Sequence, residues 1–292
     1  MIVRLIAALG AVLGLAAAGG AWAQSPPAPS DHWDLRRAGE SCYLTRSFAN
    51  GPDSLELRIQ SFGSDTPYHF ALIGNGLPIR KDRAILAHVG FGGEAAAEDM
   101  IALAGASGKL PEIVLAISQS HQTNMLGWYY SYIKTDAKLV GSFDSQAEEL
   151  YVDFADTPPI RLALGPMQAE YTRLDDCARE IVGELRAANS PGGYPALPPR
   201  MLEVPTVNRR VKYPDNLILN RISGLVEMRM TVDETGKVKG CVPQITVWVA
   251  QFGSDACHEM ERWARFEPAH DDHDKPVSTM YRTAAMYVIY NW

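Results

Sequence analysis

Alternation of apolar and polar residues marks strands along much of the chain between residues 42 and 164. The clearest case is Ser54–Gln60, where Leu55, Leu57 and Ile59 share one face, as expected of a half-buried strand. The turn-forming residues Asn50–Asp53 precede it. The segment 94–103 fits a helix as well as a strand. The same pattern predicts strands at 42–48, 68–73, 84–89, 113–117, 138–143 and 160–164.

A helical pattern follows these strands at 168–188. Leu174, Cys177, Ile181 and Leu185 lie at offsets that place them on one helical face. The next residues, 189–200, are rich in Pro and Gly, which interrupt helices and sheets. The helix therefore closes a first domain, and the Pro/Gly segment is the predicted linker.

The remaining residues contain a second set of strands. Gly224–Val232 alternates strictly, and Asp233–Gly236 forms a turn that leads into a strand at 237–249. Ser254 is the predicted N-cap of a short helix, and 277–289 forms a final strand.

These patterns predict an α+β protein in two parts. Residues 31–188 form a β-rich domain of unknown role with a closing helix. Residues 189–200 form the linker, and residues 201–292 form a small domain with a three-stranded antiparallel sheet and one or two helices.

The first 23 residues have the features of an export signal. Arg4 supplies a positive charge, Leu5–Ala23 is apolar and uncharged, and Ala21-Trp-Ala23 is a cleavage pattern. We expect cleavage before Gln24 and a periplasmic or secreted protein. A retained inner-membrane anchor is the alternative, because an apolar segment of this length could just span a bilayer.

The charge balance argues against some partners. The chain has a formal net charge of −7, and residues 201–292 contain 11 basic and 12 acidic side chains. The excess acidity therefore lies in the first domain. This balance argues against nucleic acid and anionic membrane surfaces as partners.

Four cysteines in an exported chain predict two disulfides. Three pairings are open. The pairing Cys42–Cys177 with Cys241–Cys257 is favoured, because each bond then lies within one predicted domain.

Residues capable of catalysis or metal binding are few. His270, Asp271 and His273 are weak candidate metal ligands in a polar loop, for which a solvated connection is the alternative. Gly105–Lys109 lacks the spacing of a phosphate-binding loop, and Ser118 near His121 does not define a catalytic pair. We expect no enzyme and no cofactor.

An aromatic run, Trp128–Tyr132, lies in the first domain. Such a run is typical of a strand with aromatic core residues. A recognition surface for a sugar or a peptide is the alternative reading.

The C-terminal pattern resembles the C-terminal domain of the TonB family of periplasmic proteins. The matching residues are Tyr213-Pro214, Gly224, Val226, Val232-Asp233, Gly236, Val238, Arg265-Phe266, Pro268-Ala269 and Lys275–Val277. Cys241 and Cys257 correspond to a pair found in one branch of the family. The usual Ser-Ser-Gly after the second strand and Leu-Asp before the helix are replaced here by Val247–Val249 and Phe252-Gly253.

This resemblance implies a protein-interaction module of the cell envelope that takes part in transport. TonB-family domains bind short segments of outer-membrane transporters by strand addition, so the partner is expected in the periplasm or outer membrane. The implied docking edge is the last strand, 280–290. A homodimer formed through this strand is the alternative. The candidate edge residues are Met280, Arg282, Thr283, Ala284 and Met286.

A complete energy transducer is not expected. Leu5–Ala23 lacks the Ser and His of a transducer anchor, and Ser25–Ser30 is too short to cross the periplasm. The alternatives place the function in the first domain, as a hydrolase, a metal-dependent enzyme, or a small-ligand or cell-wall binder.

Overall fold

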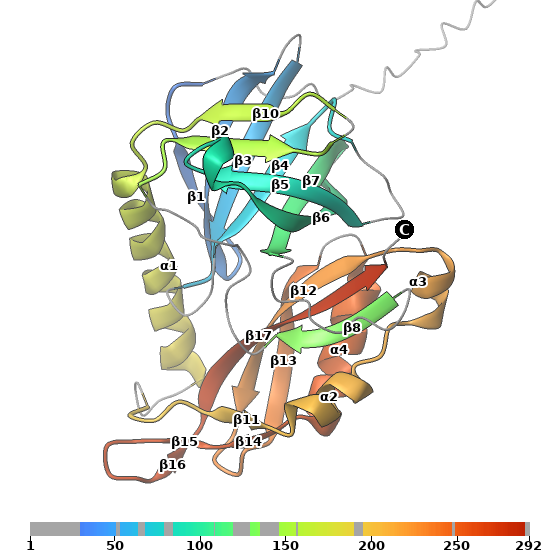
Figure 1. The fold of residues 1–292 in the computed structure, drawn as a ribbon. Coiled ribbons are helices and arrows are strands. Elements are labelled where there is room, and N and C mark those ends of the chain that lie inside the picture. Colours follow the sequence, from blue (N-terminus) through green and yellow to red (C-terminus); the bar gives the residue numbers. More distant parts are fainter. Residues whose placement is uncertain are drawn as a thin grey trace, which may run out of the picture.

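The computed structural model describes most of the chain between Ser30 and Ile289, and residues 1–29 lie outside the described part. The described ranges are 30–50, 53–63, 68–78, 84–107, 109–118, 129–134, 146–155, 157–189, 195–246 and 249–289. Two sheets organise these residues, one above the other in Figure 1, and helices pack against both. The predicted α+β class is confirmed.

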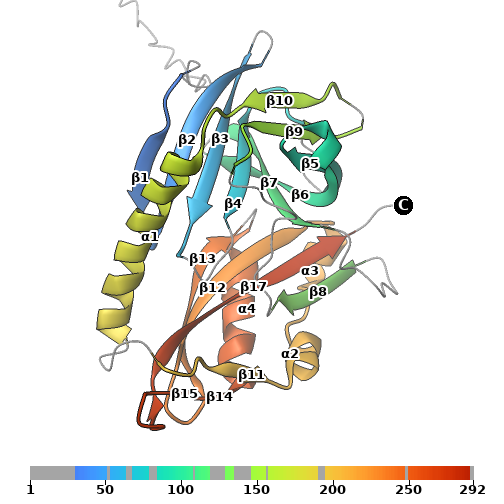
Figure 2. The ribbon, with the colours of Figure 1, turned by 60° about the vertical axis from the view of Figure 1, so that its left-hand side comes forward.

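The first sheet, here called the N-terminal sheet, contains nine antiparallel strands within the described residues. It curls so that its first and last strands lie on opposite sides of one core (Figures 1 and 2). The strand order is β1-β2-β3-β4-β7-β6-β5-β9-β10. The bounds are β1 Asp34–Ala38, β2 Ser41–Asn50, β3 Asp53–Ser61, β4 His69–Gly74, β5 Ala84–Phe91, β6 Glu98–Ser107, β7 Leu110–Ser118, β9 Glu149–Asp153 and β10 Ile160–Ala163.

The core of this sheet follows from the alternation seen in the sequence. Leu55, Leu57 and Ile59 of β3 are fully buried. They share one cluster with Leu150 of β9 and Leu162 of β10, at the other end of the sheet. The alternating positions therefore point into the space that the curled sheet encloses.

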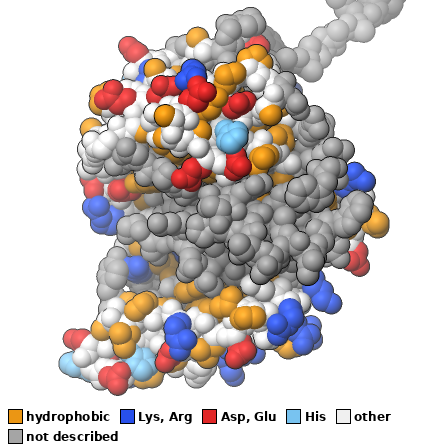
Figure 3. Space-filling model, in the orientation of Figure 1, with side chains coloured by type: hydrophobic (Ala, Val, Ile, Leu, Met, Phe, Trp, Pro, Cys, Tyr) orange, Lys and Arg blue, Asp and Glu red, His pale blue; other side chains and the backbone are white. Residues whose placement is uncertain are grey.

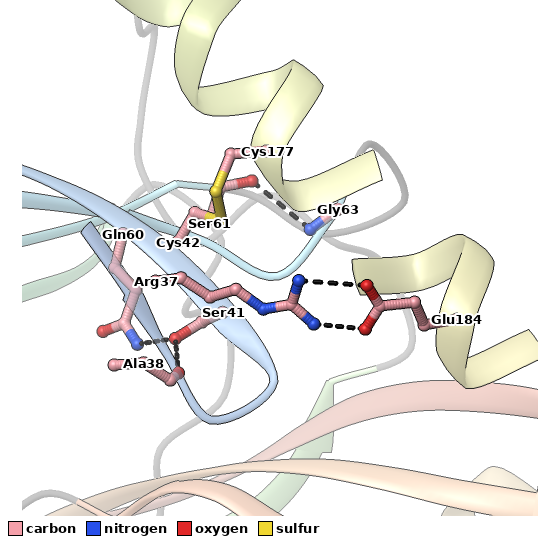
Figure 4. The surroundings of a disulfide bond; sticks show 9 residues. All are labelled: Arg37, Ala38, Ser41, Cys42, Gln60, Ser61, Gly63, Cys177 and Glu184. Atoms are coloured by element: carbon pink, nitrogen blue, oxygen red, sulfur yellow. Dashed lines mark hydrogen bonds and ion pairs between the residues drawn. A yellow bond between two sulfur atoms is a disulfide. The ribbon is translucent and has the colours of Figure 1, made fainter. Parts of the chain in front are cut away.

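Helix α1, Gln168–Asn189, closes this core (Figure 2). Leu174 and Ile181 of its apolar face lie in the core cluster. Cys177, on the same face, forms a disulfide with Cys42 of β2. Figure 4 shows this bond together with the ion pair between Arg37 and Glu184, which ties the helix to β1. The predicted helix is confirmed.

The second sheet, here called the C-terminal sheet, has the order β13-β12-β17-β8 within the described residues, and all its pairs are antiparallel. Its first three strands are those predicted for the small domain. The fourth comes from the middle of the chain. The bounds are β8 Tyr129–Lys134, β12 Gly224–Val232, β13 Val238–Thr246 and β17 Thr279–Ile289.

One face of the C-terminal sheet packs against helices. Phe252, Ala256 and Met260 of α4 are buried against Met228 and Tyr287 of the sheet. A disulfide between Cys241 and Cys257 joins α4 to β13. The helices are α2 Val204–Arg210, α3 Asp215–Leu219 and α4 Ala250–Trp263, and the short strands are β11 Arg200–Leu202, β14 Arg265–Glu267, β15 Ala269–His270 and β16 Pro276–Val277.

Some predicted elements need correction. Ser254 does not cap α4. The helix begins at Ala250, and the Ser254 hydroxyl donates to the carbonyl of Gln251 within the helix. A serine hydroxyl can satisfy a local carbonyl inside a helix as well as cap one, so residue type alone misplaced the start. The last strand begins at Thr279, because Pro276–Val277 pairs separately with β15.

The ambiguous segment 94–103 is mostly strand. A single helical turn, η1 (Glu94–Ala96), precedes β6. Strand β6 is paired on both sides, and its Met100–Leu103 are all buried. A strand that is apolar on both faces loses the period-2 pattern, which explains the ambiguity. The predicted strand at 138–143 lies outside the described residues.

Candidate strand-addition edge

Strand β17 is an interior strand of the C-terminal sheet. On one side it pairs with β12 along its length, from Val232↔Thr279 to Gly224↔Tyr287. On the other side it pairs with β8, from Ala284↔Lys134 to Ile289↔Tyr129 (Figure 1). The side of β17 away from β12 is called here the β17 edge.

Apolar layers lie on both faces of β17 beside this edge. Tyr287 is fully buried among the helices, with its ring stacked on Phe252 at a centroid distance of 4.4 Å. Met286 and Val288 point to the opposite face. There they pack against Ile101 and Leu103 of the N-terminal sheet. The edge is therefore bordered by two separate buried clusters.

The cluster between the two sheets is here called the inter-sheet cluster. It lies between β12 and β17 below and β4, β6 and β7 above. Its buried members are Ala71, Ile101, Leu103, Val114, Leu225, Ala284, Met286 and Val288. The N-terminal sheet thus covers the face of the small sheet that does not pack against α4.

The opposite edge of the C-terminal sheet, at β13, carries features that hinder strand addition. Pro243 lies within β13 and has no backbone N–H. The pairing of β13 with β12 is interrupted by register shifts at Glu227/Met228 and Thr231/Val232. Lys239 also lies on this strand and is exposed. Proline, irregular pairing and an exposed lysine are common means of keeping an edge unpaired.

A charged cluster holds the two sheets together near the start of β2. The Glu40 carboxylate accepts hydrogen bonds from Nε and Nη2 of Arg229, both at 2.7 Å. It also accepts one from Nε2 of Gln244 at 2.9 Å. The hydrogen bonds from Arg229 lower the pKa of Glu40, and the positive charge of Arg282 contributes in the same direction. Glu40 is therefore the charged partner that compensates Arg229 at this contact.

A second polar contact between the sheets is deeply buried. Nε2 of His69, in β4, lies 3.4 Å from Oε1 of Glu227, in β12, and both side chains are 5% exposed. Burial lowers the pKa of His69 to about 4. The imidazole is therefore neutral at physiological pH, and its ring packs edge-on against Phe62.

The five predicted edge residues lie at different places around the edge. Ala284 and Met286 belong to the inter-sheet cluster, and their main chain pairs with β8. Met280 and Arg282 alternate with them on the same face of β17. Thr283 is buried and points the other way. If this edge binds a partner, the main chain is what it presents, because most of these side chains pack inside the protein.

The predicted metal-ligand residues stabilise a turn. The Asp271 carboxylate accepts backbone N–H bonds from His273 at 3.0 Å and Lys275 at 2.9 Å. The hydrogen bond from Lys275 lowers its pKa. His270 Nδ1 lies 2.6 Å from Asp274. His273 is 84% exposed. Among the described residues, no group of three or more His, Cys, Asp or Glu is arranged to hold a metal ion.

The remaining chemical candidates do not come together. Gly105 lies in the β6–β7 hairpin. His121 and Trp128 lie outside the described residues.

Comparison with known proteins identifies the C-terminal part. Residues 209–289 match the family model of the Gram-negative bacterial TonB protein C-terminal. This segment is a TonB C-terminal domain. The match contains β12, β13, α4 and β17, so the resemblance seen in the sequence is confirmed. Residues before 209 lie outside it, and no curated protein or solved structure matches the chain.

Two facts about location accompany this match. The TonB family is periplasmic or envelope-associated, in accord with the two disulfides. Within the ranges that the structure describes, no helix is long and apolar enough to cross a membrane.

Few of the contacts that surround the edge could be predicted from the sequence. Leu225, Glu227 and Arg229 alternate on the β12 face that has no helix against it, and all three are buried. Two ionisable groups on a buried face are a signal that a partner surface exists. Nothing in the sequence showed that the partner groups are His69 and Glu40.

Proposed function

We propose that this protein is an exported protein-interaction module of the periplasm, whose TonB C-terminal domain binds an extended segment of a partner protein by strand addition at the β17 edge. The partner is a protein of the periplasm or the outer membrane, such as a transporter. TonB C-terminal domains are interaction domains rather than enzymes, and this supports a role in binding.

One observation carries the proposal. The β17 edge already pairs with an antiparallel strand, β8, that lies far away in the sequence. Strand addition uses the same main-chain hydrogen bonds, with side-chain contacts tuning register and specificity. The edge therefore has the geometry that a partner segment needs.

The other edge supports the same choice. Pro243 and the two register shifts make β13 a poor template for a straight added strand. The helices and the N-terminal sheet cover the two faces of the C-terminal sheet. The β17 edge is thus the best candidate for docking.

Proline substitution tests this proposal. Along β17, alternate N–H groups point toward the β17 edge, so one of two adjacent prolines removes an edge donor. The variants Arg282→Pro, Thr283→Pro and Ala284→Pro are compared with Arg282→Ala and Thr283→Ala. Proteins captured from outer-membrane and periplasmic extracts are identified by mass spectrometry, using only variants that remain folded by circular dichroism.

We expect at least one folded proline variant to lose a partner that the parent and the alanine controls retain. Folded proline variants that all capture the same proteins as the parent would show that the β17 edge is not the docking site.

A further inference from the structure

Strand β8 and a partner strand would compete for the same groups. The β17 residues that pair with β8 are Ala284–Ile289. Each has one N–H and one C=O, and those directed to the β17 edge are engaged by the β8 ladder. A second strand cannot use them at the same time.

The surroundings of this edge define which segments fit. Ala284, Met286 and Val288 belong to the inter-sheet cluster, and the residues between them belong to the cluster against the helices. All six are nearly or fully buried. Residues directly opposite one another on paired strands lie within contact distance, with Cβ atoms roughly 5 Å apart. The side chains of an added strand would therefore lie beside an apolar layer on either face of the sheet.

One helix of the C-terminal part also lies on this side of the molecule. Helix α2 lies against β8 (Figure 1). A strand at an open, solvated edge would alternate apolar and polar residues, whereas a strand covered on both faces is apolar at most positions. The β8 sequence, Tyr-Tyr-Ser-Tyr-Ile-Lys, has no such alternation and contains four aromatic or aliphatic residues among six.

We propose that the β17 edge selects extended segments that are apolar at both sets of alternate positions, and that β8 is an internal segment of this class which a partner strand must replace. This inference rests on the proposed function, since it takes the β17 edge as the docking site. The N-terminal region then does more than cover the small sheet: it supplies the competitor that keeps the edge occupied.

Replacement has a measurable thermodynamic consequence. An attached strand competes as an intramolecular ligand, so its effective concentration does not depend on the protein concentration. The apparent association constant for an external strand equals the intrinsic constant multiplied by the fraction of molecules whose edge is open. Weakening β8 must therefore raise the apparent affinity, and locking β8 must abolish binding.

The probe is a fluorescent synthetic peptide with the sequence of residues 127–136, and the readout is fluorescence anisotropy with the mature chain. In Ser131→Pro/Tyr132→Pro, one proline necessarily removes an N–H directed at β17. The matched control, Ser131→Ala/Tyr132→Ala, loses the same side chains and keeps both N–H groups. We expect the proline variant to bind the peptide at least tenfold more tightly than the parent does, and the alanine variant to lie between the two, because it loses an apolar side chain of β8 but keeps the main-chain N–H groups.

A locked variant makes the test independent of how well the proline variant folds. Ala284 and Lys134 are register partners in the β17–β8 pair. The variant Ala284→Cys/Lys134→Cys, with the new bridge established by non-reducing peptide mapping, should bind no peptide, and the single variant Lys134→Cys should not lose binding. Equal peptide affinity of parent, proline and locked proteins, or no binding by any of them, would overturn the inference.

Capture from envelope extracts separates failure of the inference from failure of the proposed function. A partner captured equally by the parent, proline and locked proteins would overturn β8 replacement and leave an interaction role elsewhere on the domain. Peptide binding that follows the expected order, with no envelope protein captured by the proline variant, would uphold the replacement of β8 and contradict the proposed function.

Discussion

At the scale of single residues, the hairpin between β12 and β13 depends on Gly236. Its φ is +77°, in the left-handed region that side chains rarely adopt. A Cβ there would lie 1.9 Å from the carbonyl oxygen of Phe266. That oxygen belongs to a backbone segment whose N–H donates to the Gly236 carbonyl at 2.8 Å. Neither backbone can move without loss of this bond.

We therefore expect Gly236→Ala to lower the free energy of unfolding by more than 2 kcal/mol, because left-handed strain alone costs about 1 to 3 kcal/mol. The control is Gly240→Ala in the neighbouring strand, where an added Cβ meets no atom within 4 Å. It should change stability by about 0.5 kcal/mol or less. Urea unfolding of both variants measures the difference. A Gly236→Ala variant as stable as the parent would mean that Gly236 is not in close contact with the backbone of β14.

The same residue shows what the sequence could predict. Asp233–Gly236 was identified as a turn from residue types alone, and its Asp233 carboxylate accepts backbone N–H bonds from Thr235 and Lys237. Such short-range chemistry is readable because all partners lie within four residues. The contact of Gly236 with Phe266 was not readable, because it joins residues separated by 30 positions.

At the scale of elements, the two disulfides fix helices to strands. The bond Cys42–Cys177 closes a sequence separation of 135 residues, and Cys241–Cys257 closes one of 16. In the chain-entropy model, a longer loop gives the larger stabilisation, about 5 kcal/mol for the first bond and about 3 kcal/mol for the second.

We expect Cys42→Ser/Cys177→Ser to lower the free energy of unfolding more than Cys241→Ser/Cys257→Ser does. Denaturant unfolding of each double variant, beside the parent, measures this order. The reverse order would show that strain or residual structure in the unfolded chain outweighs loop length. The bond between α1 and β2 would then contribute little to the free energy of unfolding.

Element prediction from the sequence succeeded where polar and apolar residue types alternate along a strand and failed where both faces of the strand are apolar. Strands β3 and β12 alternate visibly, and both were predicted within a residue or so of their bounds. Strand β6 was ambiguous because it is apolar on both faces, with Met100 and Ala102 in the core of the N-terminal sheet and Ile101 and Leu103 in the inter-sheet cluster. The aromatic run at 128–132 suggested a strand, yet periodicity has no means of showing that this strand joins the C-terminal sheet.

At the scale of the whole molecule, a covered interface joins the two sheets. Its core is apolar, and Glu40 and His69 of the N-terminal part meet Arg229 and Glu227 of the TonB C-terminal domain. In Figure 3 the acidic side chains of this view gather mainly over the N-terminal sheet. The acidity predicted for the first domain is therefore displayed on its surface, whereas Glu40 at the interface is paired with Arg229.

The interface predicts a pH dependence of stability. The pKa of His69 is lowered to about 4 by burial, against about 6.5 in an unfolded chain. Between these values the unfolded state binds more protons, so stability falls as pH decreases from about 6.5 to 4, by about 3 kcal/mol in total.

We expect His69→Gln to flatten the dependence of unfolding free energy on pH in this window, compared with the parent. The exposed His273 supplies the control, and His273→Gln should leave the slope unchanged. Urea unfolding at several pH values gives the slopes. Parallel curves for parent and His69→Gln would mean that His69 is not buried in neutral form at the interface.

The most direct test of strand addition at the β17 edge compares a position on β17 with one on β13. A photoreactive amino acid is placed at Met280, on β17, or at Lys239, on β13, and the protein is irradiated with outer-membrane and periplasmic extracts. We expect crosslinks from position 280 to one partner segment, located by mass spectrometry, and none to that segment from position 239. Crosslinks to the partner from position 239 alone, or a partner that is captured but crosslinks at neither position, would contradict docking at the β17 edge.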